Sequence, residues 1–265
     1  MGVYEINIEE FCVENPTYQR RIYGKIYYPI DPGKFPAVIL SHGFNGSHQD
    51  FEMECACYAM NGFIAYAYDF CGGSVAGKSD GATTDMTIFS EKSDLIAAYE
   101  AVRGWGKTDP ERIFLFGGSQ GGLVTALVAE ELQDSIRAMA LYYPAFNIPE
   151  DWRKNYPEIK DIPEITELWE MKLGKIFFEA IHDFYTFEEI GSFRGDVLII
   201  YGSEDPIVPS GAMERAEQVY EHIRLEVLPG EGHGFSPEGA KHAMNKVLLF
   251  MQEHSDYNNK KELAK

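Results

Sequence analysis

The sequence predicts an α/β fold: a mostly parallel central sheet with helices on both faces and an inserted helical cap. Three observations predict it. Short runs rich in branched and aromatic residues alternate with amphipathic segments of helical length. Two runs near the start alternate apolar and polar residues, as half-buried antiparallel strands do. One later interval between two such runs is about fifty residues long, much longer than a crossover needs.

The elements follow in chain order. The first two expected strands form an antiparallel edge, and the later ones are apolar enough to be covered on both faces. Expected strands lie at 3–13, 20–29, 37–43, 63–70, 112–118, 137–143, 196–202 and 224–230. Expected helices lie at 49–60, 88–103, 121–131, 210–220 and 237–253. The polar stretch after His254 is expected to fray.

The long interval divides the predicted architecture. We expect one core from residues 1–143 and 194–265, with residues 144–193 as a cap insertion rich in aromatic side chains. Open α/β sheets bind ligands at the carboxyl edge of their strands, which the cap would cover. The alternative is a helical excursion with a small core of its own.

Charge and composition narrow the function classes. The 42 Asp and Glu residues outnumber 23 Lys and Arg, which gives a formal net charge of −19. No basic cluster offers a footprint for nucleic acid or an anionic membrane surface. The start lacks the basic and apolar regions of a signal peptide, and no run of 18 apolar residues exists, so we expect a cytoplasmic protein.

The cysteines and histidines do not suggest a metal. Neither the redox C-x-x-C nor a zinc-type pair of pairs occurs, so we expect ordinary thiols and no cofactor. Five of the histidines fall in helices, the insertion or the tail, where structural or solvated roles are common. The four cysteines are Cys12, Cys55, Cys57 and Cys71, and those histidines are His48, His182, His222, His242 and His254.

Two glycine-rich motifs compete for the chemistry. "GGSVAGKS" at 72–79 matches a phosphate-binding P-loop, which needs a helix beginning at its Lys-Ser pair. Here the next residues are "DGATTDM", a poor first helical turn, and Asp80 would lie beside the phosphates. Nucleotide binding is therefore the weaker interpretation.

The second motif has the context that its chemistry needs. "GGSQGG" at 117–122 follows a buried strand and opens a good helix, the strand–turn–helix setting of a nucleophile elbow. Gly117 and Gly121 keep the neighbours of Ser119 small at this strained turn. The helix start directs positive dipole toward an oxyanion that would develop at Ser119. We therefore predict Ser119 as a nucleophile.

A serine nucleophile needs a base that an acid orients, and in this motif class the chain order is Ser, acid, His. The loop "SEDPIVP" offers Glu204 and Asp205, and "EGHGFSP" offers His233. Both loops leave the same sheet edge as Ser119, so we predict a Ser119–His233–Asp205 triad.

The oxyanion would need two backbone donors. One is the N–H of Gln120, the residue after the nucleophile. The loop "SHGFNGS" should supply the other, where Gly43 lets the chain turn and the Phe44 N–H points at the oxyanion.

"SHGF", "GGSQGG", "GSEDPIVP" and "GEGHGFS" together resemble the serine α/β-hydrolases. From 23 to 253 the chain is similar, more narrowly, to bacterial feruloyl (cinnamoyl) esterases and related carboxylesterases, with an insertion of similar length at the same place. The family's D-x-x-G-x-G-x-S-x-G loop is matched from Asp69 to Gly81 if a few residues are inserted after Gly72. The resemblance thus explains the P-loop match as part of a hydrolase loop.

Two departures concern specificity. The family often has His before the nucleophile, and we expect Gly118 at that place to widen the elbow. In cinnamoyl esterases an Asp and a Tyr of the insertion hold the phenolic hydroxyl. The resemblance implies that Asp151 and Phe177 occupy these substrate-binding positions, and Phe177 cannot donate that hydrogen bond.

The expected function is hydrolysis of small or aromatic acyl esters, hydroxycinnamate esters among them, through a serine acyl-enzyme. A peptidase-like or acyl-transferring hydrolase would use the same triad, and a receptor built on the same fold would lack turnover. The expected partner is a small-molecule ester, without nucleic acid or membrane. The sequence leaves the choice between monomer and homodimer open.

Overall fold

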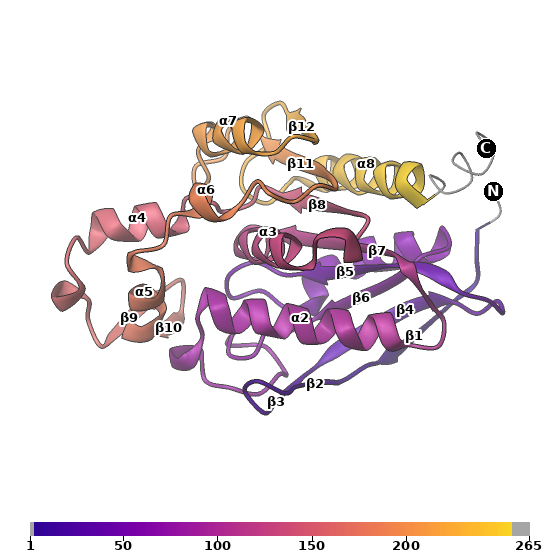
Figure 1. The fold of residues 1–265 in the computed structure, drawn as a ribbon, viewed down its shortest axis with the longest axis horizontal. Coiled ribbons are helices and arrows are strands. Elements are labelled where there is room, and N and C mark those ends of the chain that lie inside the picture. Colours follow the sequence, from indigo (N-terminus) through magenta and orange to yellow (C-terminus); the bar gives the residue numbers. More distant parts are fainter. Residues whose placement is uncertain (1–2, 256–265) are drawn as a thin grey trace.

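An eight-stranded sheet forms the centre of the molecule in the computed structural model, which describes residues 3–255. The strands of this sheet are β1 Ile6–Glu10, β4 Gly24–Pro29, β5 Phe35–Ser41, β6 Ile64–Tyr68, β7 Thr108–Gly118, β8 Ala138–Tyr142, β11 Asp196–Gly202 and β12 Ile223–Leu228. They lie in the order β1-β4-β6-β5-β7-β8-β11-β12 (Figure 1). Strand β4 pairs antiparallel with both of its neighbours, and the pairs from β6 to β12 are parallel. A separate short hairpin joins β2 Val13–Asn15 to β3 Arg20–Ile22.

Helices cover both faces of this sheet. They are α1 Glu52–Met60, α2 Ile88–Gly104, α3 Gln120–Leu132, α7 Ser210–Val219 and α8 Pro237–Ser255. Apolar side chains of α2, α3 and α7 share one buried cluster with one set of strand residues. Those of α1 and α8 share a second cluster with the alternate strand residues. This separation follows from the two-residue period of a strand and confirms the predicted α/β fold.

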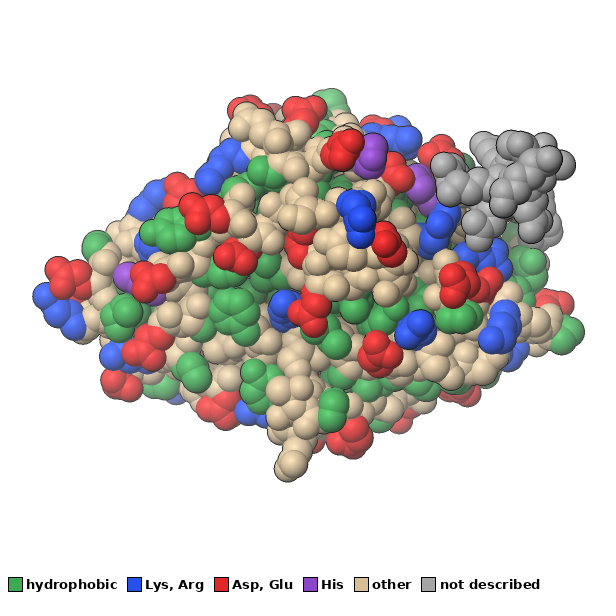
Figure 2. All heavy atoms as spheres, viewed as in Figure 1, with side chains coloured by type: hydrophobic (Ala, Val, Ile, Leu, Met, Phe, Trp, Pro, Cys, Tyr) green, Lys and Arg blue, Asp and Glu red, His purple; other side chains and the backbone are tan. Residues whose placement is uncertain are grey.

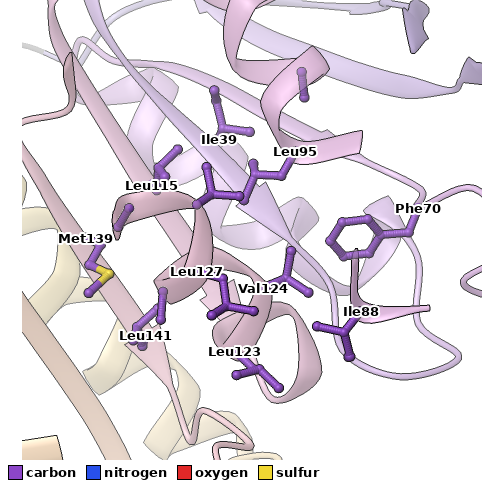
Figure 3. Close-up of a cluster of buried hydrophobic side chains, with 14 of the residues drawn as sticks. Ile39, Phe70, Ile88, Leu95, Leu115, Leu123, Val124, Leu127, Met139 and Leu141 are labelled. Carbon is purple, nitrogen blue, oxygen red and sulfur yellow. The ribbon is translucent and has the colours of Figure 1, made fainter. Parts of the chain in front are cut away.

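Figure 3 shows how the first of these clusters is built. Leu115 and Leu141, on neighbouring strands, and Leu123, Val124 and Leu127 of α3 belong to one buried cluster. Each of these side chains is at most 6% exposed. Burial of a large aliphatic side chain contributes about 1.5–3 kcal/mol, so this cluster fixes α3, and with it the turn before α3, to the sheet.

The segment between β8 and β11 lies at one end of the molecule, on the left in Figure 1. It contains α4 Ile148–Asn155, β9 Ile165–Leu168, β10 Met171–Gly174, α5 Lys175–His182 and α6 Thr186–Glu189. Its buried residues, such as Phe146 and Ile181, belong to the same cluster as those of α2 and α3. The β9–β10 hairpin differs from the expectation of an all-helical insertion. Its four-residue strands are too short for a clear period, and its turn lacks the Asn-Gly signal.

Two further observations concern the charges on the surface and the length of the helices. Figure 2 shows acidic and basic side chains interspersed over the face that carries α2. None of the helices within residues 3–255 is long and apolar enough to cross a membrane.

Candidate active site

Ser119 stands at the sharp turn where β7 ends and α3 begins. Its backbone has φ 52° and ψ −120°, a conformation that costs a non-glycine residue about 1–3 kcal/mol. Local hydrogen bonds hold it there. Its N–H donates to the Tyr142 carbonyl at 2.9 Å, and its own carbonyl accepts from Ala145 N–H at 2.9 Å. The strained turn exposes the Ser119 side chain at the carboxyl edge of the sheet.

The glycines around Ser119 permit close backbone approaches. A Cβ on Gly117 would collide with the carbonyl of Gly121 and the hydroxyl of Thr125. On Gly121, a Cβ would lie 2.8 Å from the Ser41 carbonyl carbon. At Gly118 it would meet the Phe51 ring at 3.0 Å, so that ring fills the space where we expected a wider elbow.

The structure brings the three residues of the predicted triad into one hydrogen-bonded chain. His233 Nε2 lies 2.9 Å from Ser119 Oγ, and His233 Nδ1 lies 2.9 Å from Asp205 Oδ2. The His233 side chain is 15% exposed and the Asp205 side chain 2%. The ring of Tyr143 packs on the imidazole with centroids 4.5 Å apart. These contacts leave one imidazole edge facing the serine and the other facing the carboxylate.

The loop after β11 decides between the two candidate acids. Asp205 Oδ1 accepts from the N–H groups of Ile207 at 2.8 Å and Val208 at 2.9 Å, which fixes the carboxylate toward His233. Glu204 is exposed, and its N–H donates to the Glu231 carbonyl at 2.9 Å. The geometry therefore favours Asp205 as the acid.

The loop that carries one predicted oxyanion donor lies against Ser119, and the other predicted donor follows Ser119 in the chain. Gly43 lies against it, since a Cβ on Gly43 would be 3.1 Å from Ser119 Cβ and 3.7 Å from Ser119 Oγ. Phe44 follows in the same loop. Gln120 is the first residue of α3, so its N–H has no partner within the helix.

His42 is a residue that the sequence analysis missed. Its Nε2 accepts from the Phe70 N–H at 3.0 Å, so its Nδ1 carries the proton and donates to the Gly43 carbonyl at 2.7 Å. Burial lowers the pKa of His42, which keeps the ring neutral in this arrangement. In the sequence, only its place directly before Gly43 in "SHGF" indicated a role near the predicted oxyanion donors. His42 therefore holds the start of residues 42–47, which carry the predicted oxyanion donor Phe44 and are called the oxyanion loop below.

A buried carboxyl group lies beside the start of α3. The Gln120 side chain donates to Glu91 Oε2 at 2.8 Å, and Glu91 is 1% exposed. Burial raises the pKa of Glu91 to about 8, although the hydrogen bond from Gln120 opposes that shift. Glu91 is thus largely protonated at neutral pH, which avoids a buried charge beside the α3 start.

The loop that matched a P-loop closes on the end of β6 instead of opening a helix. Asp69 Oδ2 accepts from the Lys78 N–H at 2.8 Å, and the Asp69 carbonyl accepts from the Ser79 hydroxyl at 2.5 Å. Asp69 Oδ1 accepts from the buried His48 ring at 2.6 Å. The next α-helix starts only at Ile88, so Lys78 and Ser79 lack the helix N-terminus that cradles phosphates.

The two residues proposed for substrate binding lie in the insertion. Asp151, on α4, accepts from Asn147 Nδ2 at 2.6 Å and pairs with Lys154 at 3.2 Å. Asn147 also donates to the Ile207 carbonyl at 3.1 Å, which links α4 to the Asp205 loop. Phe177, on α5, is 1% exposed and packs against Phe178. Their role in binding a substrate stays a prediction.

The sheet, the elbow serine and the strand-end loops define this protein as a serine hydrolase of the α/β-hydrolase fold. Residues 34–183, more than half of the chain, match the family described as serine aminopeptidase, S33, and the chain belongs to that family.

Several relatives and solved structures are similar to this chain. An uncharacterized protein of Mycobacterium tuberculosis is 28% identical over 213 residues, 79% of this chain and 67% of its own length. The caffeoylshikimate esterase of Arabidopsis thaliana is 29% identical over 144 residues, 52% of this chain and 41% of its own. Est1E of Butyrivibrio proteoclasticus, solved with ferulic acid bound, superposes with a TM-score of 0.83. It is 24% identical, and the match covers 92% of this chain and 98% of that one.

Proposed function

We propose that this protein hydrolyses carboxylic esters through an acyl-enzyme formed on Ser119. The observation that carries the proposal is the continuous chain from Ser119 Oγ through His233 to Asp205, with both hydrogen bonds at 2.9 Å. A lone serine is a weak nucleophile, and a base within hydrogen-bond reach that an acid orients is what activates it.

The geometry supports the following steps. Ser119 Oγ attacks the ester carbonyl while its proton moves to His233 Nε2, and Asp205 stabilises the imidazolium. The N–H groups of Phe44 and Gln120 bind the oxyanion. His233 then returns the proton to the leaving alcohol. A water molecule, deprotonated by His233, attacks the acyl group and releases the acid and Ser119.

We propose small or aromatic acyl groups as substrates, hydroxycinnamates among them, because aromatic rings lie near the triad. Tyr143 covers His233, and the Phe44 ring lies beside Trp169 with centroids 5.8 Å apart. Est1E was solved with ferulic acid bound, and the Arabidopsis relative is a caffeoylshikimate esterase. We also propose that residues 144–193 act as a cap, in which Asp151 contacts the substrate and the buried Phe177 shapes the cap from within.

Initial rates on methyl ferulate, p-nitrophenyl butyrate and an aminoacyl p-nitroanilide test the proposal, with Ser119→Ala beside the wild type. We expect turnover of an ester that Ser119→Ala loses. A higher kcat/KM on ferulate would support the aromatic specificity, and butyrate turnover alone would indicate a general carboxylesterase. The family's description favours a peptidase as the second candidate, and preferential cleavage of the anilide would establish it.

A further inference from the structure

Asn45, the residue after the proposed oxyanion donor Phe44, joins three segments that are far apart in the sequence. Its N–H donates to the Gly73 carbonyl at 3.2 Å, and its Oδ1 accepts from the Val75 N–H at 3.0 Å. These bonds fix it to the loop after β6. Its Nδ2 donates in the other direction, to the Trp169 carbonyl at 3.1 Å, 124 residues away.

The acceptor of that last bond lies in the turn of the β9–β10 hairpin. Leu168 pairs with Met171, so Trp169 and Glu170 are the two turn residues. Both have positive φ, 44° and 65°. Such a turn favours Asn and Gly, and other residues there are strained, so their persistence needs support from the surroundings.

Docking on the oxyanion loop supplies such support. The Trp169 ring meets the Phe44 ring edge-on at 5.8 Å, next to the bond between the Trp169 carbonyl and Asn45. Trp169 is nevertheless 59% exposed, so burial of its ring contributes little to this contact. The hydrogen bond from Asn45 is therefore the directional part of the contact.

We propose that Asn45 is a positioning residue that couples the β9–β10 hairpin to the oxyanion loop, so that the docked hairpin holds the Phe44 N–H in place. The inference rests on the proposed ester hydrolysis, because the Phe44 N–H has a function only if an oxyanion forms at Ser119. It makes the insertion a determinant of kcat as well as of substrate affinity. A purely structural tie would affect stability and leave the kcat of the folded enzyme unchanged.

Substitutions of Asn45 can separate its two side-chain hydrogen bonds, the one to Val75 and the one to Trp169. Its φ of 56° is a conformation that Asn, Asp and Gly all accept. Asn45→Asp keeps an acceptor for the Val75 N–H but faces the Trp169 carbonyl with an oxygen, so it loses the bond to the hairpin and also adds a negative charge. Asn45→Gly removes both side-chain bonds without backbone strain. The exposed Gln19, at φ 53° in the turn before β3, gives a matched control as Gln19→Gly.

The experiment measures kcat and KM on p-nitrophenyl butyrate and amide hydrogen exchange of residues 165–174 in all four proteins. Loss of an oxyanion donor costs 10²–10³ in kcat, so its displacement should lower kcat about tenfold in both Asn45 variants. The fall in the uncharged Asn45→Gly separates this displacement from an effect of the added charge in Asn45→Asp. We expect faster exchange of the hairpin amides in both Asn45 variants and wild-type behaviour in Gln19→Gly.

Two outcomes overturn the coupling: unchanged exchange in the hairpin, or faster exchange with kcat within twofold of the wild type. If the wild type and Ser119→Ala hydrolyse the ester equally, the proposed function fails instead. The exchange measurement still decides whether Asn45 holds the hairpin.

Discussion

Replacement of Gly121 by alanine is a direct test of how the elbow is packed. Gly121 is the second residue of α3, and an added Cβ would lie 2.8 Å from the Ser41 carbonyl carbon, with the carbonyl oxygens of Ser41 and His42 nearer still. Carbon atoms make optimal contact at about 3.5–4.0 Å, so the overlap is about 0.7 Å or more. Backbone carbonyls at the end of a central strand cannot rotate away, so either α3 or the oxyanion loop must move.

Overpacking of this kind costs about 1–3 kcal/mol and occasionally more. Because the opposing atoms are backbone, we expect Gly121→Ala to lower the free energy of unfolding by about 3 kcal/mol, the upper end of that range. We also expect kcat to fall, since His42 and Gly43 lead directly to the Phe44 N–H.

Gly211→Ala is the matched control for this variant. Gly211 is likewise the second residue of its helix, α7, and a Cβ there would meet nothing within 4 Å. We expect it to be neutral or to stabilise by up to about 1 kcal/mol through helix propensity. Urea unfolding followed by far-UV circular dichroism measures both. Equal unfolding free energies for the two variants, with wild-type kcat, would refute this account of the elbow.

Three further predictions concern substitutions of acidic residues. Asp205→Asn should lower kcat by about 10³-fold or more, whereas the exposed Glu204→Gln should stay within about twofold; the reverse pattern would assign the acid to Glu204. Burial raises the pKa of Glu91 to about 8, so the folded state keeps a proton that the unfolded state loses, and stability falls as pH rises from about 4.5 through 8. Glu91→Gln should therefore gain unfolding free energy relative to wild type between pH 6 and pH 9, and parallel pH profiles would contradict this. Glu170→Gly should relieve the backbone strain of the φ of 65° and raise the unfolding free energy by about 1 kcal/mol, as measured by urea titration. A lower unfolding free energy would show that the turn is unstrained.

The local pattern of apolar and polar residues predicted most strands of the sheet and the turn at Ser119. The apolar run before Gly117 and the helix-forming residues after Gly122 lie close together in sequence, so their structure follows from short-range preferences. The convergence of Ser119, Asp205 and His233 was predictable because carboxyl ends of parallel strands meet at one edge.

Long-range side-chain contacts were not predictable in this way. The β9–β10 hairpin has a turn whose residues do not favour it, and its support comes from Asn45, 124 residues away. The buried pair of His48 and Asp69 and the ring of Phe51 against Gly118 likewise depend on segments that only the folded chain brings together. The periodicity of the sequence does not predict such contacts.

Covalent labelling of the nucleophile tests the central claim most directly. An activated serine attacks the phosphorus of a fluorophosphonate and displaces fluoride, and mass spectrometry locates the resulting adduct on a peptide. We predict one adduct, on Ser119, with labelling lost in Ser119→Ala and strongly slowed in His233→Ala. Labelling at another residue, or equal labelling of wild type and His233→Ala, would contradict a triad at this site.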